Sequence, residues 1–192
     1  MLFDRIAPVY SLFFNYQTRI YKRDLNIVEK KITLSSFETV LDVGSGTGAL
    51  CNVLHSEGFR VAGAEASQGM LKVAHHKLAG KNIELIEADV LAGLPFPDKS
   101  FDLAIASFVA HGLNAIQRET MYKEMNRTAK HLVILVDYNR RRSALTDLAE
   151  TLEGGDYFNF IKEVVPELRR IFKEVQIINT GPRSSWYVCR AY

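Results

Sequence analysis

The stretch VLDVGSGTGAL, residues 40–50, constrains the fold of this chain more than any other. Apolar residues run into a glycine-rich turn and a helical pattern starts directly after it, which predicts a buried strand, a loop and a helix. Gly44, Gly46 and Gly48 allow a tight turn and close contact with a ligand, and they leave the amides at the start of the helix able to bind it. The stretch therefore predicts a nucleotide-cofactor loop.

The spacing of this loop fits two kinds of cofactor. Gly44, Gly46 and Ala49 match the dinucleotide pattern G-x-G-x-x-G/A, and Glu65 follows where a ribose-binding acid belongs. Asp42 argues against a dinucleotide, because its carboxylate would lie close to a doubly charged pyrophosphate. S-adenosylmethionine carries a sulfonium and an ammonium but no phosphate, so an acid near the loop favours it directly or through an ordered water. We expect S-adenosylmethionine as the cofactor.

Three acids at the ends of successive predicted strands carry a likeness to a known family. Asp42 precedes the loop, Glu65 ends the apolar run RVAGAE, and Asp89 ends IELIEAD. In these features the chain resembles the class I S-adenosylmethionine-dependent methyltransferases, and the likeness extends over nearly all of it. The resemblance implies that Glu65 accepts hydrogen bonds from both ribose hydroxyls and that Asp89 accepts one from the adenine amine. The cofactor site implied in this way consists of Asp42, Gly44, Ser45, Gly46, Gly48, Glu65, Ala66, Asp89, Val90 and Ser107.

Strands and helices alternate along the middle of the chain, which predicts a parallel sheet. The expected strands are residues 39–43, 60–65, 83–88, 101–107 and 132–137. Ser67 is placed to cap the start of the second intervening helix, and Gly58 and Gly80 to end the first two. Late in the chain, KEVQIINT and SSWYVCRAY are joined by Gly181 and Pro182, which suggests an antiparallel pair at one edge. The family that the chain resembles ends in such a reversed pair.

These elements together predict an α/β fold. We expect a Rossmann-like three-layer sandwich with a mostly parallel seven-stranded sheet, an antiparallel strand at the C-terminal edge and an N-terminal helical lid. With 192 residues, 47% hydrophobic and 24% charged, the chain can bury about 70% of its extended surface in one core. The prediction is a single methyltransferase domain over residues 1–192, with the lid at 1–37 and the cofactor-binding core at 38–192.

Nothing in the sequence indicates a membrane span or a metal site. No apolar run approaches the roughly 18 residues that cross a bilayer, and Asp4 and Arg5 interrupt the start before a signal-like segment, so we expect a cytoplasmic protein. The histidines at 75–76 are adjacent on a predicted helix and point in different directions. Cys51 and Cys189 belong to no metal-binding pattern, so we interpret them as reduced packing thiols.

The charge pattern bears on possible partners. A net charge of +2 gives no general field for nucleic acid, so the sequence does not favour a nucleic-acid partner. The triplet of residues 140–142, all arginine, follows the fifth strand and could face an acidic substrate; the alternative is a solvated loop, which short charge runs usually form.

The methyl acceptor is expected beside two groups of aromatic residues. Both groups could fold over the carboxyl edge of the sheet as a lid, or they could pack helices on the sheet. The opening FDRIAPVY is similar to the start of the ubiquinone/menaquinone-type methyltransferases, which implies that Tyr10 lies near the reacting methyl; Ser11 follows it where that group commonly has Asp. This likeness supports a small-molecule acceptor more than any named compound. The aromatic residues are Phe3, Tyr10, Phe13, Phe14, Tyr16 and Tyr21 in the first group, and Tyr157, Phe158 and Phe160 in the second.

Methyl transfer asks mainly for alignment of the acceptor and exclusion of water, and a base is not always needed. Where a proton must be lost, His111 is the first candidate, because it follows the fourth strand; the alternative is a histidine that only holds its loop. The segment ASFVAHGL lacks the Asp/Asn-Pro-Pro-aromatic pattern by which methyltransferases of nucleobase amines resemble one another. Two other classes stay open: a methyltransferase acting on RNA or protein, and a non-catalytic cofactor-binding module.

Overall fold

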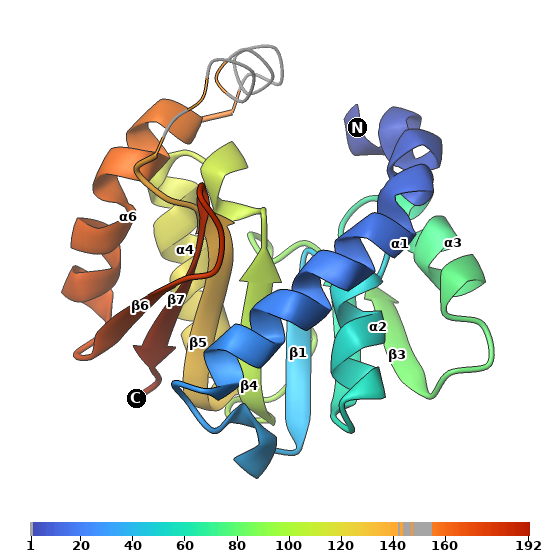
Figure 1. Ribbon diagram of the computed structural model, residues 1–192, viewed down its shortest axis with the longest axis horizontal. Coiled ribbons are helices and arrows are strands. Elements are labelled where there is room, and N and C mark those ends of the chain that lie inside the picture. The colour runs from blue at the N-terminus through green and yellow to red at the C-terminus, as the bar shows by residue number, and fades with distance from the viewer. Residues whose placement is uncertain (1, 142, 144–146, 148–154) are drawn as a thin grey trace.

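The computed structural model describes residues 2–141, 143, 147 and 155–192, and within them a seven-stranded sheet has the order β3-β2-β1-β4-β5-β7-β6 (Figure 1). Strands β1 to β5 pair in parallel, whereas β7 is antiparallel to both β5 and β6. This arrangement confirms the predicted α/β fold. The strands are β1 (Thr39–Val43), β2 (Arg60–Glu65), β3 (Ile83–Glu87), β4 (Phe101–Ser107), β5 (Ala129–Tyr138), β6 (Val175–Asn179) and β7 (Ser184–Arg190).

Helices cover both faces of the sheet and make the structure three-layered (Figure 1). One face carries α1 (Leu2–Glu29), α2 (Ala49–Ser56) and α3 (Gln68–Lys77). The other carries α4 (Ala115–Thr128) and α6 (Tyr157–Ile171). Two single 3-10 turns, η1 (Leu34–Ser36) and η2 (Ala110–Gly112), precede β1 and follow β4. Because helices cover both faces, the central strands are apolar almost throughout, as is usual for parallel sheets.

Side chains alternate between the two apolar layers along each central strand. In β5, Val133 and Leu135 join the layer beneath α4 and α6, whereas Ile134 and Val136 join the layer beneath α1 and α2. In β7, the fully buried Trp186 belongs to the second of these layers. A slip of one residue in the pairing would exchange these layers, so the pattern fixes the register.

The element boundaries follow the sequence closely. β1, β2 and β4 have the predicted limits, while β3 ends one residue early and β5 is longer at both ends. Ser67 caps α3 by accepting a hydrogen bond from the Met70 amide at 3.2 Å. Gly58 and Gly80 take left-handed conformations after α2 and α3. The predicted reversed pair forms, with β6 rather than β7 at the edge.

The N-terminal segment is a single long helix that lies across α2 and α3 (Figure 1). Its aromatic residues divide between two environments. Phe14 and Tyr21 are buried in the apolar layer, whereas Phe13 and Tyr16 are 52% and 63% exposed. The first pair therefore packs the helix on the core, as one of the two sequence interpretations proposed. None of the helices in the described part of the chain combines the length and the hydropathy of a membrane-spanning segment.

Candidate functional site

The sheet topology brings the predicted cofactor residues to one edge. The strand order reverses beside β1, because β2 lies on one side of it and β4 on the other. Ligands of open α/β sheets bind at such a point, outside the carboxyl ends of the strands. Four predicted parts of the site lie at or just beyond the carboxyl ends of adjacent strands here: the loop 44–48, Glu65, Asp89 and Ser107.

The glycine loop is shaped by packing on one side and is open on the other. Gly44 and Gly46 have φ values of 69° and 55°, which favour glycine. A Cβ at Gly44 would lie 2.5 Å from Cγ2 of Val109, whereas a Cβ at Gly46 would meet nothing within 4 Å. The backbone at Gly46 can therefore be approached closely by a ligand.

The loop amides are bonded within the protein. The amides of Gly44 and Ser45 donate to the Ala64 carbonyl at 2.8 and 3.1 Å, and the Gly46 amide donates to Oε2 of Glu65 at 2.8 Å. The sequence predicted available amides at the start of the following helix, α2, which are different groups from these three.

Asp42 is a buried carboxylate with spare bonding capacity. Its Oδ2 accepts a hydrogen bond from the Cys51 thiol at 3.1 Å. Its Oδ1 and the hydroxyl of Ser45 are buried and have no hydrogen-bond partner in the described part of the chain. Burial raises the pKa of Asp42 to about 7; the Cys51 contact lowers it and the negative charge of Glu65 raises it further. Since a nearby cation would relieve this penalty, the residues fit a positively charged cofactor.

The Cys51 thiol itself is not activated. Burial and the adjacent Asp42 raise its pKa well above the usual range, so it stays protonated. Cys51 and Cys189 are both buried and reduced, in agreement with the sequence interpretation.

The two acids after β2 and β3 lie in different environments. Glu65 accepts the amide of Ser67 at 2.8 Å through Oε1, in addition to that of Gly46 through Oε2. Asp89 is exposed and accepts the Leu91 amide at 2.9 Å, next to the buried Val90. The ribose and adenine roles of these residues stay predictions.

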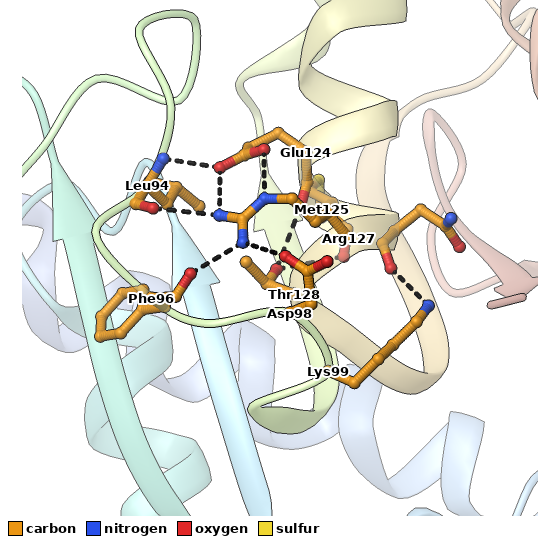
Figure 2. Close-up of polar contacts among 9 residues, drawn as sticks. Leu94, Phe96, Asp98, Lys99, Glu124, Met125, Arg127 and Thr128 are labelled. Atoms are coloured by element: carbon orange, nitrogen blue, oxygen red, sulfur yellow. Dashed lines mark hydrogen bonds and ion pairs between the residues drawn. The ribbon is translucent and has the colours of Figure 1, made fainter.

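An arginine of α4 anchors the loop that carries Asp89 and Val90. Arg127 donates to the carbonyls of Leu94 and Phe96 at 3.0 and 2.8 Å (Figure 2). It also pairs with Glu124 and Asp98, both at 2.7 Å. Glu124 in turn accepts the Leu94 amide at 2.6 Å, so the loop is held through both backbone groups of Leu94 (Figure 2). No sequence motif indicates this anchor.

His111 and Asp137 meet at the ends of β4 and β5. Nδ1 of His111 lies 2.8 Å from Oδ1 of Asp137, and both side chains are buried. The other oxygen of Asp137 accepts the amides of Ala110 and His111 at 3.1 and 3.3 Å. The sequence placed His111 at this edge but missed Asp137, whose one local signal is its position at the end of a strand.

Aromatic rings surround this pair. The ring of His111 lies 4.9 Å from that of Tyr138, 6.3 Å from Phe108 and 6.4 Å from Phe160, measured between centroids. Phe108 is 38% exposed and has a left-handed φ of 53°. Tyr157 and Phe160 are buried, so they form the base of this aromatic cluster rather than a cover over it.

The helix α1 also reaches the site edge. The hydroxyl of Tyr21 lies 3.1 Å from Oγ of Ser107, the last residue of β4. Burial raises the pKa of Tyr21 well above its usual range, and hydrogen bonding to Ser107 only partly opposes this, so the hydroxyl is neutral. Tyr10 lies about three turns earlier on the same helix and is half-buried. Its place near a reacting methyl stays a prediction.

The arginines after β5 lie elsewhere. Arg140 and Arg141, with Arg169 of α6, line a groove of about 480 Å³ whose floor includes Val165 and Tyr187. It lies between α6 and the strands β6 and β7, away from the glycine loop. The third residue of the triplet, Arg142, lies outside the described residues. No group of three or more potential metal ligands occurs in the part of the chain that the structure describes.

Comparisons with known proteins show the family to which the chain belongs. Residues 40–131 match the family model described as a methyltransferase domain. A demethylmenaquinone methyltransferase of Paenarthrobacter aurescens is 34% identical over 67% of this chain and 49% of its own length. An uncharacterized methyltransferase of Alkaliphilus oremlandii is 27% identical over 98% of this chain and 94% of its own. A crystal structure of a putative S-adenosylmethionine-dependent methyltransferase from Methanococcus maripaludis has a TM-score of 0.74, at 20% identity, over 97% of this chain and 92% of that one.

The chain therefore belongs to the class I S-adenosylmethionine-dependent methyltransferases, as its sequence predicted. The prediction of S-adenosylmethionine as the cofactor is thereby also confirmed. Alignments cover only 29% of the demethylmenaquinone methyltransferase of Clavibacter sepedonicus and 49% of the P. aurescens protein, so the chain spans about half or less of the length of such relatives.

Proposed function

We propose that this chain transfers the methyl group of S-adenosylmethionine to a small-molecule acceptor. The observation that carries the proposal is the position of two groups of residues on one sheet edge. The acidic glycine loop follows β1, and the His111–Asp137 pair with its aromatic rings follows β4 and β5, beside it in the sheet. A donor bound at the first group would lie next to an acceptor held at the second.

The donor would be held by charge and by shape. Oδ1 of Asp42 and the Ser45 hydroxyl, which are buried and have no hydrogen-bond partner among the described residues, suit the cationic methionyl end together with the open face at Gly46. Glu65 would accept the ribose hydroxyls, and Asp89 with Val90 would hold the adenine. When bound, the sulfonium supplies an activated methyl and a good leaving group. The protein then needs to align the acceptor and exclude water.

The acceptor end favours an apolar molecule. Phe108 and Tyr138 present partly exposed rings beside His111. Aromatic walls with a few polar groups are typical of sites for small organic ligands. Relatives named as demethylmenaquinone methyltransferases also support a small organic acceptor, without naming the one used here.

Two measurements test the proposal. S-adenosylmethionine and its demethylated product should raise the melting temperature, whereas NAD at equal concentration should not, because only a ligand that binds the folded state stabilises it. The protein should then transfer radioactive methyl from labelled cofactor to the low-molecular-mass fraction of a cell extract. Label found only in RNA or protein, or thermal stabilisation by NAD alone, would contradict the proposal.

A second function has one observation in its favour. The groove beside Arg140, Arg141 and Arg169 is basic and would suit a polyanion such as RNA. In that case, affinity for RNA would fall steeply with added salt, because binding would release counterions. Weak, salt-insensitive binding of RNA would argue against an RNA acceptor and favour the small-molecule function.

A further inference from the structure

The groove between α6 and the strands β6 and β7 has an apolar floor. These two strands form one end of the sheet, and α6 lies beside them (Figure 1). Ile177 of β6 lines the groove and is 40% exposed, so the helix does not cover the last strand completely. Val165 and Pro166 of α6 and Tyr187 of β7 also line it. Its volume of about 480 Å³ is in the range of sites for small organic ligands.

Three arginines line the same groove and form no ion pair in the described part of the chain. Arg140 and Arg141 follow β5, Arg169 belongs to α6, and all three are exposed. The side chain of Arg140 donates to the uncharged carbonyl of Lys162 at 3.2 Å. Arg127, by contrast, pairs with two carboxylates. Since the described lining of the groove contains no acidic residue, its positive charge is left for an anion that binds there.

The backbone beside two of these arginines is held in place by Asn139. Its amide donates to the Arg183 carbonyl at 2.9 Å, and its Oδ1 accepts the Arg141 amide at 2.9 Å. Ser185, another residue of the lining, is fully buried and donates to Oδ1 of Asn179 at 2.8 Å. These bonds form within the protein before any ligand is present, and a backbone held in this way lowers the entropic cost of binding.

We propose that this groove is a second ligand site, which binds a small organic anion with a carboxylate or phosphate on an apolar body. The anionic group would contact the guanidinium groups, whose paired N–H donors match either kind of oxyanion. The apolar body would cover Ile177 and Val165 on the floor. The inference goes beyond the proposed methyl transfer and does not depend on it, because the groove lies away from the glycine loop and its ligand needs no cofactor.

Shape and charge favour a small anion over RNA at this groove. Proteins that bind single-stranded RNA combine cations along the backbone with exposed aromatic rings on which bases stack. Tyr187 is the one aromatic residue in the described lining, and it is only 2% exposed. The net charge of +2 also gives no general field that would attract a polyanion. Aliphatic side chains beside a few arginines suit a ligand with one anionic end.

Titration calorimetry on the cofactor-free protein tests the site with defined probes. Octanoate and octyl phosphate carry an anion on an apolar chain, whereas inorganic phosphate lacks the chain and 1-octanol lacks the charge. At least one octyl anion should bind about tenfold or more tightly than either control, because each control lacks one half of the interaction. The octyl anion that binds more tightly identifies the anionic group. Equal affinity for 1-octanol and both octyl anions, or binding of neither octyl anion, would overturn the proposal.

Substitutions show which residues hold the anion. Arg141→Gln and Arg169→Gln should each weaken the tighter octyl anion by about tenfold or more, because each removes a charge-assisted hydrogen bond. Arg170→Gln is the matched control, since this arginine is the next residue of α6 and is exposed but does not line the groove. Ile177→Thr should weaken binding about threefold or more, whereas Ile116→Thr, at an 80% exposed position of α4, should not. If neither groove arginine differs from Arg170→Gln, the assignment is wrong.

Methyl NMR of the wild-type protein locates the same probe without any substitution, so the test does not depend on how a variant folds. The octyl anion should shift the signals of Ile177 and Val165 and leave that of Ile116 in place. Shifts at Val90, beside the predicted adenine site, without shifts at Ile177 would contradict the proposal. A short RNA that shifts Ile177 when neither octyl anion does so would replace it with an RNA site. None of these measurements uses methyl transfer, so a failure of the proposed function leaves their outcome unchanged.

Discussion

The hydroxyl of Tyr21 lies 3.1 Å from Oγ of Ser107, and this contact joins two parts of the chain that are 86 residues apart. It attaches the N-terminal helix to the end of β4, beside the residues proposed to bind the cofactor and the acceptor. The helix is therefore part of the wall of the candidate site as well as a cover for α2 and α3. Substitutions in α1 are therefore expected to affect the residues at the carboxyl end of β4.

Removing this hydroxyl tests the attachment. Tyr21→Phe should lower the free energy of unfolding by about 1 kcal/mol, because one buried hydrogen bond is lost while the ring still packs. Urea denaturation measures the change, and Tyr16→Phe at a 63% exposed position on the same helix is the matched control. Equal midpoints for wild type and Tyr21→Phe would show that the contact contributes nothing.

Asp42 should make the stability of the cofactor-free protein depend on pH. Its pKa rises from an ordinary 3.8 to about 7 in the folded state, so the folded state binds the proton more tightly than the unfolded chain does. The stabilisation is fully present below about pH 4 and is lost as the pH rises through about 7, by at most about 4 kcal/mol. Asp42→Asn should remove this dependence of stability on pH, whereas Asp89→Asn, at an exposed position, should keep it. Denaturation curves at several pH values measure both, and parallel slopes in wild type and Asp42→Asn would contradict the assignment.

The same group links cofactor binding to protons. A cationic ligand favours the ionised form of Asp42, so S-adenosylmethionine should bind more tightly as the pH rises through about 7 and should release a proton below it. Calorimetry in buffers of different ionisation enthalpy measures that proton. In Asp42→Asn both the release and the pH dependence near neutrality should disappear. A proton released equally by the variant would assign the effect to another group.

Glu65→Ala is expected to weaken binding of the cofactor without unfolding the protein. Charge-assisted hydrogen bonds contribute roughly 1.5 to 3 kcal/mol each, so the loss should be about 2 to 4 kcal/mol in binding free energy. Part of it would come from the Gly46 amide, which loses its partner at 2.8 Å. Glu87→Ala, at an exposed residue that ends β3, serves as the control. Titration calorimetry measures the affinity for the cofactor, and an unchanged affinity in Glu65→Ala would show that Glu65 does not bind the cofactor.

Arg127→Lys should loosen the loop after β3. A lysine cannot reproduce the planar fork that joins two carbonyls and two carboxylates, so we expect a loss of about 2 kcal/mol in stability and faster hydrogen exchange at Leu94. Lys123→Ala, which breaks an exposed pair with Glu119, should change stability by less than about 0.5 kcal/mol. If the two variants behave alike, the anchor has no special strength.

Sequence reasoning reached the features that depend on neighbours along the chain. The limits of β1, β2 and β4, the Ser67 cap and the reversed pair all follow from local spacing and turn residues. Gly44 shows the limit of such local reasoning. Position 44 requires glycine partly because a Cβ there would collide with Val109, which lies in another loop.

The features that were missed join distant segments. Asp137 meets His111 across 26 residues, and Arg127 meets Phe96 across 31, through side chains whose meeting depends on the register of the sheet and the packing of α4. An acid at a strand end or an arginine on a helix looks the same in the sequence whether or not it finds such a partner. A single sequence contains no local pattern that distinguishes a residue with such a partner from one without it.

The position of β7 has a consequence for synthesis of the chain. This strand, Ser184–Arg190, lies between β5 and β6, and its Trp186 is fully buried against the helices on one face. A nascent chain that has not reached residue 190 lacks an inner strand, so β5 then has one unpaired edge and β6 has no neighbour. Such an open edge can pair with other chains. We therefore expect C-terminal truncations before β7 to aggregate rather than to leave a smaller folded enzyme.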